Sequence, residues 1–88
     1  MKHQRDFETS SQGLREALRV NSLIRDLDRI VLLIDSDIAR EEKESGVSDL
    51  SNAVYSLAAR LLRVRRDNLS HTIASLETRV AALDRTNG

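Results

Sequence analysis

The stretch ESGVS at residues 44–48 separates two long segments whose apolar residues recur at helical spacing. The two segments are nearly equal in length, and Gly46 lies at the centre of the break. A glycine directly after a helix is typical of the C′ position, where the backbone turns left-handed, and Val47 is the apolar residue that often follows. The sequence therefore predicts an all-α fold: a long antiparallel α-hairpin that turns at Gly46.

The boundaries of this hairpin follow from its capping residues. Ser48 is a suitable N-cap for the second helix, and Asp49 in the first turn favours the positive end of the helix dipole. In chain order we expect a flexible N-terminus at 1–10, a first helix at about 11–45, a turn at 46–48, a second helix at about 49–84 and a flexible C-terminus at 85–88, so that the helical hairpin covers 11–84.

Composition limits the class of protein. The chain has 88 residues, no Cys and no Pro, and its 14 basic and 14 acidic side chains balance. The longest apolar run, residues 30–34, is far shorter than the roughly 20 residues that span a membrane. We expect one cytoplasmic domain with no cofactor and no membrane contact. The excess of Arg over Lys fits a GC-rich bacterial genome as well as selection for bidentate pairing.

The first helix carries a heptad-like apolar seam and further apolar residues outside it. The seam consists of Ala17, Val20, Ile24, Leu27, Val31, Ile34 and Ile38. Leu23 and Ile30 widen it on one flank, whereas Leu32 and Leu33 lie on the far side. A helix that is apolar on nearly all sides is usually covered on more than one side. This pattern predicts that two hairpins associate into a four-helix bundle, with an interface formed by Leu23, Ile24, Leu27, Ile30, Val31, Leu32, Leu33, Ile34, Leu61, Leu62 and Leu69.

The apolar spacing of the second helix contains one irregularity. Its seam is expected at Leu50, Val54, Leu57, Leu61, Val64, Leu69, Ile73, Leu76, Val80 and Leu83. The step from Val64 to Leu69 is longer than the others, so either the seam drifts around one helix or a third helix begins near Asp67. We favour one continuous helix, because neither Gly nor Pro intervenes. A turn at Gly46 would place Ile24 opposite Leu69.

Arg60, Arg63 and Arg66 form the strongest charge feature, and it has two interpretations. Either they form a stripe that contacts nucleic-acid phosphates, or the charges are used internally. In the expected register Arg63 and Arg66 lie near Asp26 and Asp28, and the segment 35–49 is net acidic. We favour internal pairing, because a nucleic-acid stripe leaves unopposed positive charge and is usually accompanied by aromatic residues.

No arrangement of residues predicts catalysis or metal binding. In each Asp-x-Asp pair of the first helix, the two carboxylates point to opposite sides. His71 lacks a Ser, Cys or Glu partner at usable spacing, so we interpret it, with Asn68, as a polar residue near the seam that sets register or is partly exposed. Tyr55 is expected to pack near the turn, opposite Ile38, with its hydroxyl in water.

One family resemblance covers about 20 residues. Leu27-Asp28-Arg29, followed by Leu32-Leu33 and Arg40, superficially resembles the first helix of the all-α chorismate mutases, which are small helical dimers. That fold implies three helices per protomer and further polar residues, and the second half of this chain has no match to them. No family is assigned on this basis.

The sequence thus predicts a non-enzymatic assembly, adaptor or regulatory protein. Its expected partners are a second copy of itself, as a homodimer or higher oligomer, and another protein. The alternative is a small nucleic-acid-binding regulator that uses Arg60, Arg63 and Arg66, and a more remote one is a helical-dimer enzyme.

Overall fold

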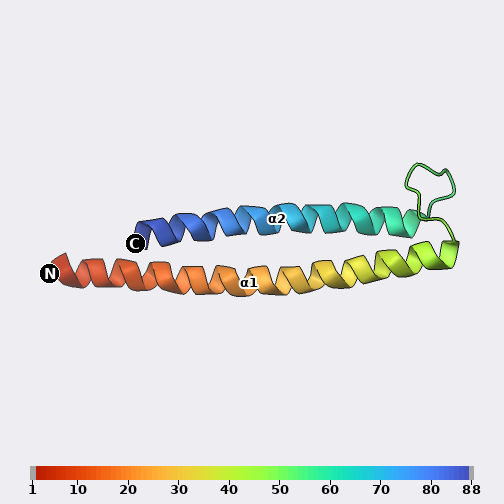
Figure 1. Cartoon of the computed structure of the whole chain (residues 1–88). Helices are drawn as coiled ribbons and strands as arrows, with labels where there is room; N and C mark the ends of the chain where they lie inside the picture. Colours follow the sequence, from red (N-terminus) through yellow and green to blue (C-terminus); the bar gives the residue numbers. More distant parts are fainter. Residues whose placement is uncertain (1, 88) are drawn as a thin grey trace.

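The chain forms two long antiparallel α-helices connected by a loop (Figure 1). This computed structural model describes the backbone of residues 2–87 and the side chains of residues 11–83. Helix α1 spans Lys2–Ser45 and helix α2 spans Leu57–Asn87, with residues 46–56 between them. The predicted all-α hairpin is therefore confirmed.

The molecule is an elongated rod with a single helix-to-helix contact. At 1.5 Å per residue the 44 residues of α1 extend about 66 Å, and the longest dimension of the molecule is 67 Å, against 18 and 15 Å across. The radius of gyration is 19.6 Å, whereas a compact domain of this length has about 12 Å. Each helix therefore covers only one face of the other.

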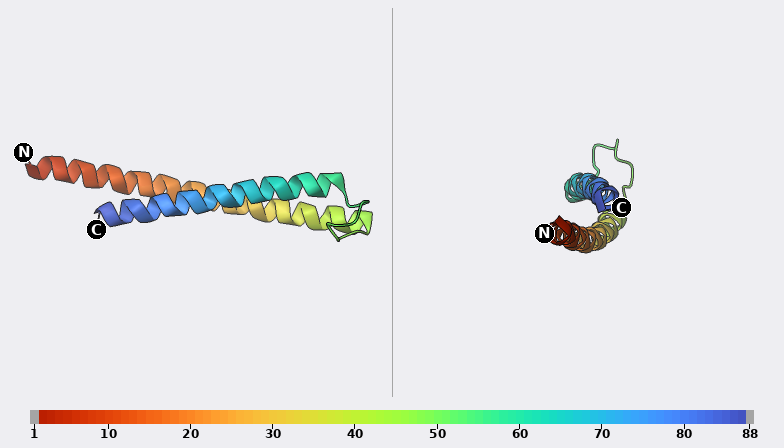
Figure 2. Two further views of the ribbon diagram at one scale, coloured as in Figure 1. Left: turned by 90° about the horizontal axis from the view of Figure 1, so that it is seen from above. Right: turned by 90° about the vertical axis from the view of Figure 1, so that its left-hand side faces the viewer.

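The two helices cross at a shallow angle and α1 is the longer. Figure 2 shows α2 passing from one side of α1 to the other along the rod. The N-terminal end of α1 extends beyond the C-terminal end of α2 (Figure 1). No helix in the described part of the chain is both long enough and apolar enough to cross a membrane.

The core is one strip of small and medium-sized side chains between the helices. We call the positions of α1 that face it the α1 seam: Ala17, Val20, Ile24, Leu27, Val31, Ile34 and Ile38, all of them buried or half-buried. The residues predicted from the spacing are the ones that pack, so this prediction is confirmed. Ala59 of α2 is completely buried, and a small residue at this position permits the two backbones to approach closely.

Helix α1 ends at the predicted glycine. Gly46 has a φ of +73°, and its N–H donates to the carbonyl of Glu42 at 2.9 Å. This bond from C′ to C3 is the αL termination, which glycine adopts without a Cβ penalty. The Val47 N–H, in turn, lies 3.3 Å from Oγ of Ser45.

Helix α2 begins later than the sequence predicted, and Ser56 rather than Ser48 is its N-cap. Oγ of Ser56 accepts a hydrogen bond from the N–H of Ala59 at 3.2 Å. The backbone carbonyl of Ser56 accepts one from the N–H of Arg60 at 3.0 Å. The preceding residues make local bonds instead: Asp49 accepts the N–H of Ser51 at 3.0 Å. Such side-chain bonds compete with the helix, which explains the longer loop.

The longer loop shifts the pairing of the helices. Arg66 pairs with Asp35 at 3.1 Å and Arg63 pairs with Glu42 at 3.3 Å, whereas a turn confined to 46–48 would have placed both arginines near Asp26 and Asp28. The predicted register was therefore wrong, because residues 49–56 belong to the loop and not to the helix.

Helix α2 runs without interruption through Asp67, as predicted. Helix α1 begins at Lys2, earlier than the expected start near residue 11. The side chains of residues 1–10 and 85–88 are outside the described ones. The flexibility predicted for these two segments therefore stays a prediction.

Candidate oligomer interface

Helix α2 carries two heptad-like seams on opposite faces. The inner seam, which faces α1, consists of Ala59, Leu62, Arg66, Leu69, Ile73, Leu76, Val80 and Leu83, each of them buried or half-buried. The outer seam consists of Leu57, Leu61, Val64, Asn68, His71, Ser75, Thr78 and Ala82, each of them exposed. Both seams alternate steps of three and four residues, so they stay on their own faces along the helix.

The existence of two seams explains the irregular step between Val64 and Leu69. Val64 belongs to the outer seam and Leu69 to the inner one, so the step crosses from one face to the other. The single predicted seam of the second helix is therefore divided in the structure: Leu57, Leu61 and Val64 are exposed, whereas Leu69 and the later apolar residues are buried or half-buried.

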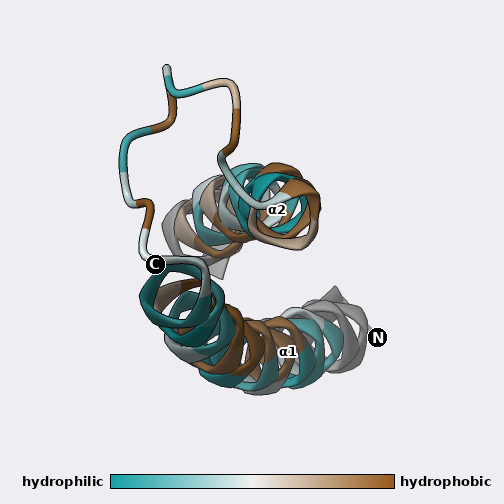
Figure 3. Cartoon of the chain, turned by 90° about the vertical axis from the view of Figure 1, so that its right-hand side faces the viewer, coloured by the Kyte–Doolittle hydropathy of each residue, from teal (hydrophilic) through white to brown (hydrophobic). Residues whose placement is uncertain are grey.

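The first half of the outer seam is apolar and uncovered. Leu57 is 68% exposed, Leu61 is 62% exposed and Val64 is 54% exposed. Val54 and Leu50 of the preceding loop are also exposed, but they are not part of the helical seam, because α2 begins at Leu57. Figure 3 shows hydrophobic residues on the first turns of α2 and in the loop. These five residues, Leu50, Val54, Leu57, Leu61 and Val64, are called the apolar outer patch.

The outer face of α1 is apolar only in places. Leu32 and Leu33 are 68% and 61% exposed, as expected for residues on the far side of the helix. Leu14 and Leu18 are also exposed. Leu18 and Leu32 lie on one side of the helix, but the positions between them at alternating three- and four-residue steps are Asn21, Arg25 and Asp28. These polar residues prevent a continuous apolar seam.

The other residues predicted for the interface divide between hairpin packing and exposure. Ile34 is buried inside the hairpin. Half-buried positions are Ile24, Leu27, Val31, Leu62 and Leu69. Leu23 and Ile30, at the edge of the α1 seam, are exposed. The fold therefore leaves Leu23, Ile30, Leu32, Leu33 and Leu61 of the predicted set largely free to contact another molecule.

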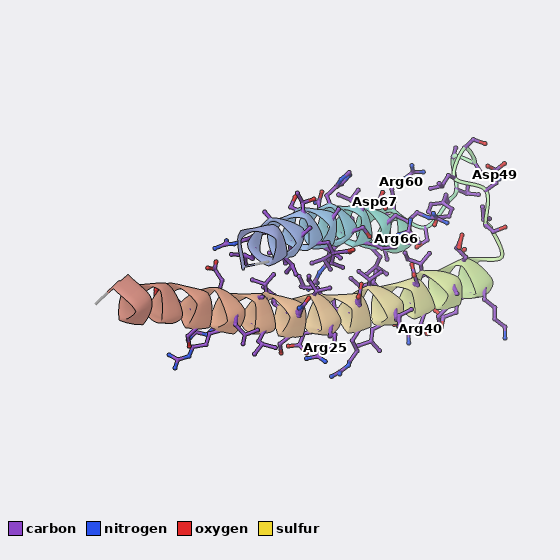
Figure 4. All side chains as sticks on the ribbon, turned by 60° about the vertical axis from the view of Figure 1, so that its left-hand side comes forward. Arg25, Arg40, Asp49, Arg60, Arg66 and Asp67 are labelled. Carbon is purple, nitrogen blue, oxygen red and sulfur yellow. The ribbon has the colours of Figure 1, made fainter. Side chains whose placement is uncertain are left out.

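The basic cluster is largely occupied within the hairpin. Arg63 donates from Nη2 to Glu42 at 3.3 Å, and Arg66 pairs with Asp35 and also with Asp67 at 3.3 Å. Figure 4 shows Arg66 directed toward α1, whereas Arg25 and Arg40 extend from other sides of α1. The predicted internal pairing is present; its acidic partners belong to the segment 35–49 and are not Asp26 and Asp28.

Arg60 is held by the loop. Its Nη2 donates to the carbonyl of Leu50 at 3.3 Å, and its guanidinium carbon lies 5.4 Å from the centroid of the Tyr55 ring. Arg65 is exposed, and no ion pair of Arg65 occurs within residues 11–83. The three arginines proposed for phosphate contact thus have internal partners, which weakens the case for a nucleic-acid stripe.

Tyr55 anchors the loop to α2. Only 5% of its surface is exposed, and its hydroxyl accepts a hydrogen bond from Nε of Arg63 at 2.8 Å. This bond is the main reason that the pKa of Arg63 is raised above its ordinary value, and the bond to Glu42 raises it by a smaller amount. The expectation that the hydroxyl would lie in water was wrong. The sequence signal is the spacing from Tyr55 to Ala59 and Leu62, which continues the inner seam into the loop.

Asp49 is a fully exposed carboxylate at the loop. Oδ1 accepts the Ser51 hydroxyl at 2.8 Å and the Ser51 N–H at 3.0 Å, and these two bonds lower the pKa of Asp49. Figure 4 places it at the tip of the loop. Among residues 11–83 no ion pair involves Asp49. It is therefore a fixed, unpaired negative charge.

Within residues whose side chains are described, no group of three or more His, Cys, Asp or Glu side chains is arranged to hold a metal ion. Asn68 and His71 are exposed members of the outer seam. Comparisons with protein-family models, curated proteins and solved structures found no match to this chain.

Proposed function

We propose that this protein is a non-enzymatic helical assembly protein, an adaptor or regulator that self-associates and contacts other proteins in the cytoplasm. The observation that supports this proposal is the apolar outer patch: Leu57, Leu61 and Val64 are exposed on one face of α2, and Leu50 and Val54 are exposed in the loop that precedes it. Contiguous exposed apolar surface of this kind marks interaction sites in soluble proteins.

The energetics favour reversible association. Burying a Leu or Val side chain completely is worth about 1.5–3 kcal/mol, so covering five half-exposed side chains on each of two copies yields roughly 10 kcal/mol. The loss of translational and rotational freedom on association costs about 4–15 kcal/mol. Because the two terms are similar, the oligomer is expected to dissociate on dilution.

The second candidate, nucleic-acid binding, has weaker support. Arg63 and Arg66 have carboxylate partners within the hairpin, and their use on phosphates would break those pairs. Binding to RNA or DNA at low salt that falls steeply with salt and disappears in Arg63→Ala would favour that alternative.

The test of the proposal is the mass of the protein in solution. Light scattering combined with circular dichroism, over a dilution series through the micromolar range, is expected to give a helical oligomer that shifts toward monomer at low concentration. A fully helical monomer at every concentration would contradict the proposal.

A further inference from the structure

The side of α1 that faces away from α2 carries cations and leucines but no carboxylate. We call this side the basic face of α1. Its positions recur mainly at steps of three and four residues and cover about one third of the helix circumference. Its cations are Arg15, Arg25, Arg29, Arg40 and Lys43. Its apolar residues are Leu14, Leu18, Leu32 and Leu33, and serines occupy the remaining positions.

The charges of α1 are segregated around the helix. Every Asp and Glu between residues 11 and 45 lies outside the basic face, although the chain as a whole has no net charge. All cations and leucines of this face are exposed. Figure 4 shows Arg25 and Arg40 extending from α1 on the side away from α2. The positive side of the helix is therefore open to contact.

Most cations of the basic face have no ion pair. Among residues 11–83, no ion pair involves Arg15, Arg25, Arg29 or Lys43. Arg40 pairs with Asp37 at 3.0 Å, but the two side chains are 63% and 43% exposed, and exposed pairs of this kind are weak. The face thus presents positive charge that attracts an anionic partner.

We propose that the basic face of α1 binds the surface of a bilayer that contains anionic lipids. A helix that lies in the interface places its apolar side chains at the boundary between headgroups and acyl chains, and its cations among the headgroups. The long stems of Arg and Lys permit this, because they follow the leucines inward while the charged ends stay at the headgroup level. This contact goes beyond the proposed self-association and uses a different face of the rod.

A contact with the bilayer surface requires no membrane-spanning helix. The expectation of no membrane contact was based on the short apolar runs of the sequence, and run length bears on spanning segments. The feature that bears on surface binding is the distribution of charge and leucine around the helix, which becomes visible once the face that packs against α2 is known.

The interleaving of cations and leucines distinguishes the bilayer from other anionic partners. Arg25 and Arg29 lie between Leu18 and Leu32, in the middle of the face. A protein helix packed there would remove both guanidinium groups from water, which is costly unless each is paired. Nucleic acid would use the cations through its phosphates but would leave the exposed leucines without a partner. The interface of an anionic bilayer accommodates both kinds of side chain.

Co-sedimentation of the complete chain with lipid vesicles tests the proposal. One set of vesicles is phosphatidylcholine alone, and the other is phosphatidylcholine with phosphatidylserine. The chain is expected to bind only the vesicles with phosphatidylserine, and less strongly as salt is raised, because the attraction of cations to an anionic surface is screened. Failure to bind these vesicles at low salt would overturn the inference.

Charge reversal on the two helices shows whether the basic face makes the contact. Arg29→Glu changes this face, and Arg65→Glu is the matched control on α2, because both arginines are exposed and neither has an ion pair among residues 11–83. Arg29→Glu should weaken vesicle binding by at least about tenfold, whereas Arg65→Glu should change it little. Equal losses would show attraction without a defined face and would overturn the inference.

Replacement of leucines separates bilayer binding from simple attraction to anions. Leu18→Ser combined with Leu33→Ser should weaken vesicle binding by about tenfold or more, because less apolar surface enters the interface. Both side chains are exposed, so circular dichroism should show the same helix content. Unchanged vesicle binding would contradict the proposed insertion. Binding to double-stranded DNA or RNA that depends on Arg29, without vesicle binding, would assign the face to nucleic acid and overturn the inference.

Discussion

Nε of Arg63 donates a hydrogen bond to the hydroxyl of Tyr55 at 2.8 Å, and this bond fixes the loop against α2. The same guanidinium also reaches Glu42 near the end of α1. The two residues therefore connect all three parts of the hairpin at its closed end, which makes this contact a sensitive point for stability.

Two replacements of Tyr55 are expected to destabilise the hairpin by different amounts. Tyr55→Phe removes a hydrogen bond to a charged donor and should lower the free energy of unfolding by about 1–2 kcal/mol. Tyr55→Ala also removes a buried ring and should cost about 3 kcal/mol or more. Urea denaturation followed by circular dichroism measures both, with exposed Ser70→Ala as control. Equal effects of Phe and Ala would show that the ring contributes no packing.

The ion pair between Arg66 and Asp35 tests the register of the helices. A double-mutant cycle with Arg66→Gln and Asp35→Asn should give a coupling free energy of about 0.5–1 kcal/mol, because both side chains are partly exposed. The matched cycle with Asp28→Asn should give a coupling close to zero. A larger coupling for Asp28 than for Asp35 would support the shorter turn that the sequence had suggested.

Gly46 is the position where the loop depends on glycine. Its φ of +73° is unfavourable for other residues, but no atom within 4 Å would meet an added Cβ. Gly46→Ala should therefore cost about 1–2 kcal/mol through backbone strain alone. Gly46→Asn should cost less, because Asn tolerates this conformation better. Thermal denaturation of the two variants gives the comparison, and an Ala variant as stable as the original would contradict it.

The carboxyl group of Asp49 should titrate at lower pH than an ordinary Asp. The pKa is lowered by the two bonds from Ser51, so the ionised form stabilises the loop at neutral pH. That contribution is lost as the pH falls through the lowered pKa. NMR titration of the Asp49 side chain in the original protein and in Ser51→Ala measures the effect. The pKa should rise in the variant; an unchanged value would remove Ser51 as the cause.

Charged substitutions test whether the exposed face of α2 or that of α1 forms the oligomer interface. Leu61→Lys places a charge in the apolar outer patch and should shift the oligomer to monomer, with a loss of affinity of at least tenfold. Leu32→Lys is the matched control, because its exposure in the hairpin is similar. Neither change removes a buried contact, so circular dichroism should remain the same. Sedimentation over a concentration series separates the two variants, and the opposite order would place the interface on α1.

Local signals in the sequence were sufficient for most of the fold. Gly46 predicted the end of α1, because glycine readily adopts the left-handed conformation in which the last carbonyl groups of a helix are satisfied. The regular spacing from Ala17 to Ile38 identified the face of α1 that packs, and the absence of Gly and Pro near Asp67 predicted an uninterrupted α2.

The start of α2 was not visible in the same way. Ser48 and Ser56 are both acceptable N-caps followed by apolar residues, so capping preference does not distinguish them. The bonds of Asp49 to Ser51, of Asn52 to Val54 and of Tyr55 to Arg63 stabilise the loop. The last of these forms only when Tyr55 is buried against α2, so it depends on the tertiary structure.

The sequence by itself determined that this chain is an α-hairpin with more apolar surface than one hairpin can bury. Only the tertiary structure decided which face of α2 meets α1. The outer seam is the more apolar at its start, with Leu57, Leu61 and Val64, yet the inner seam is the one that packs. The physical reason is complementarity: Ala59 allows close approach of the helices, and Arg66 reaches Asp35 across the contact. Periodicity defines the faces of each helix, but the fit between two helices selects the pair that is buried.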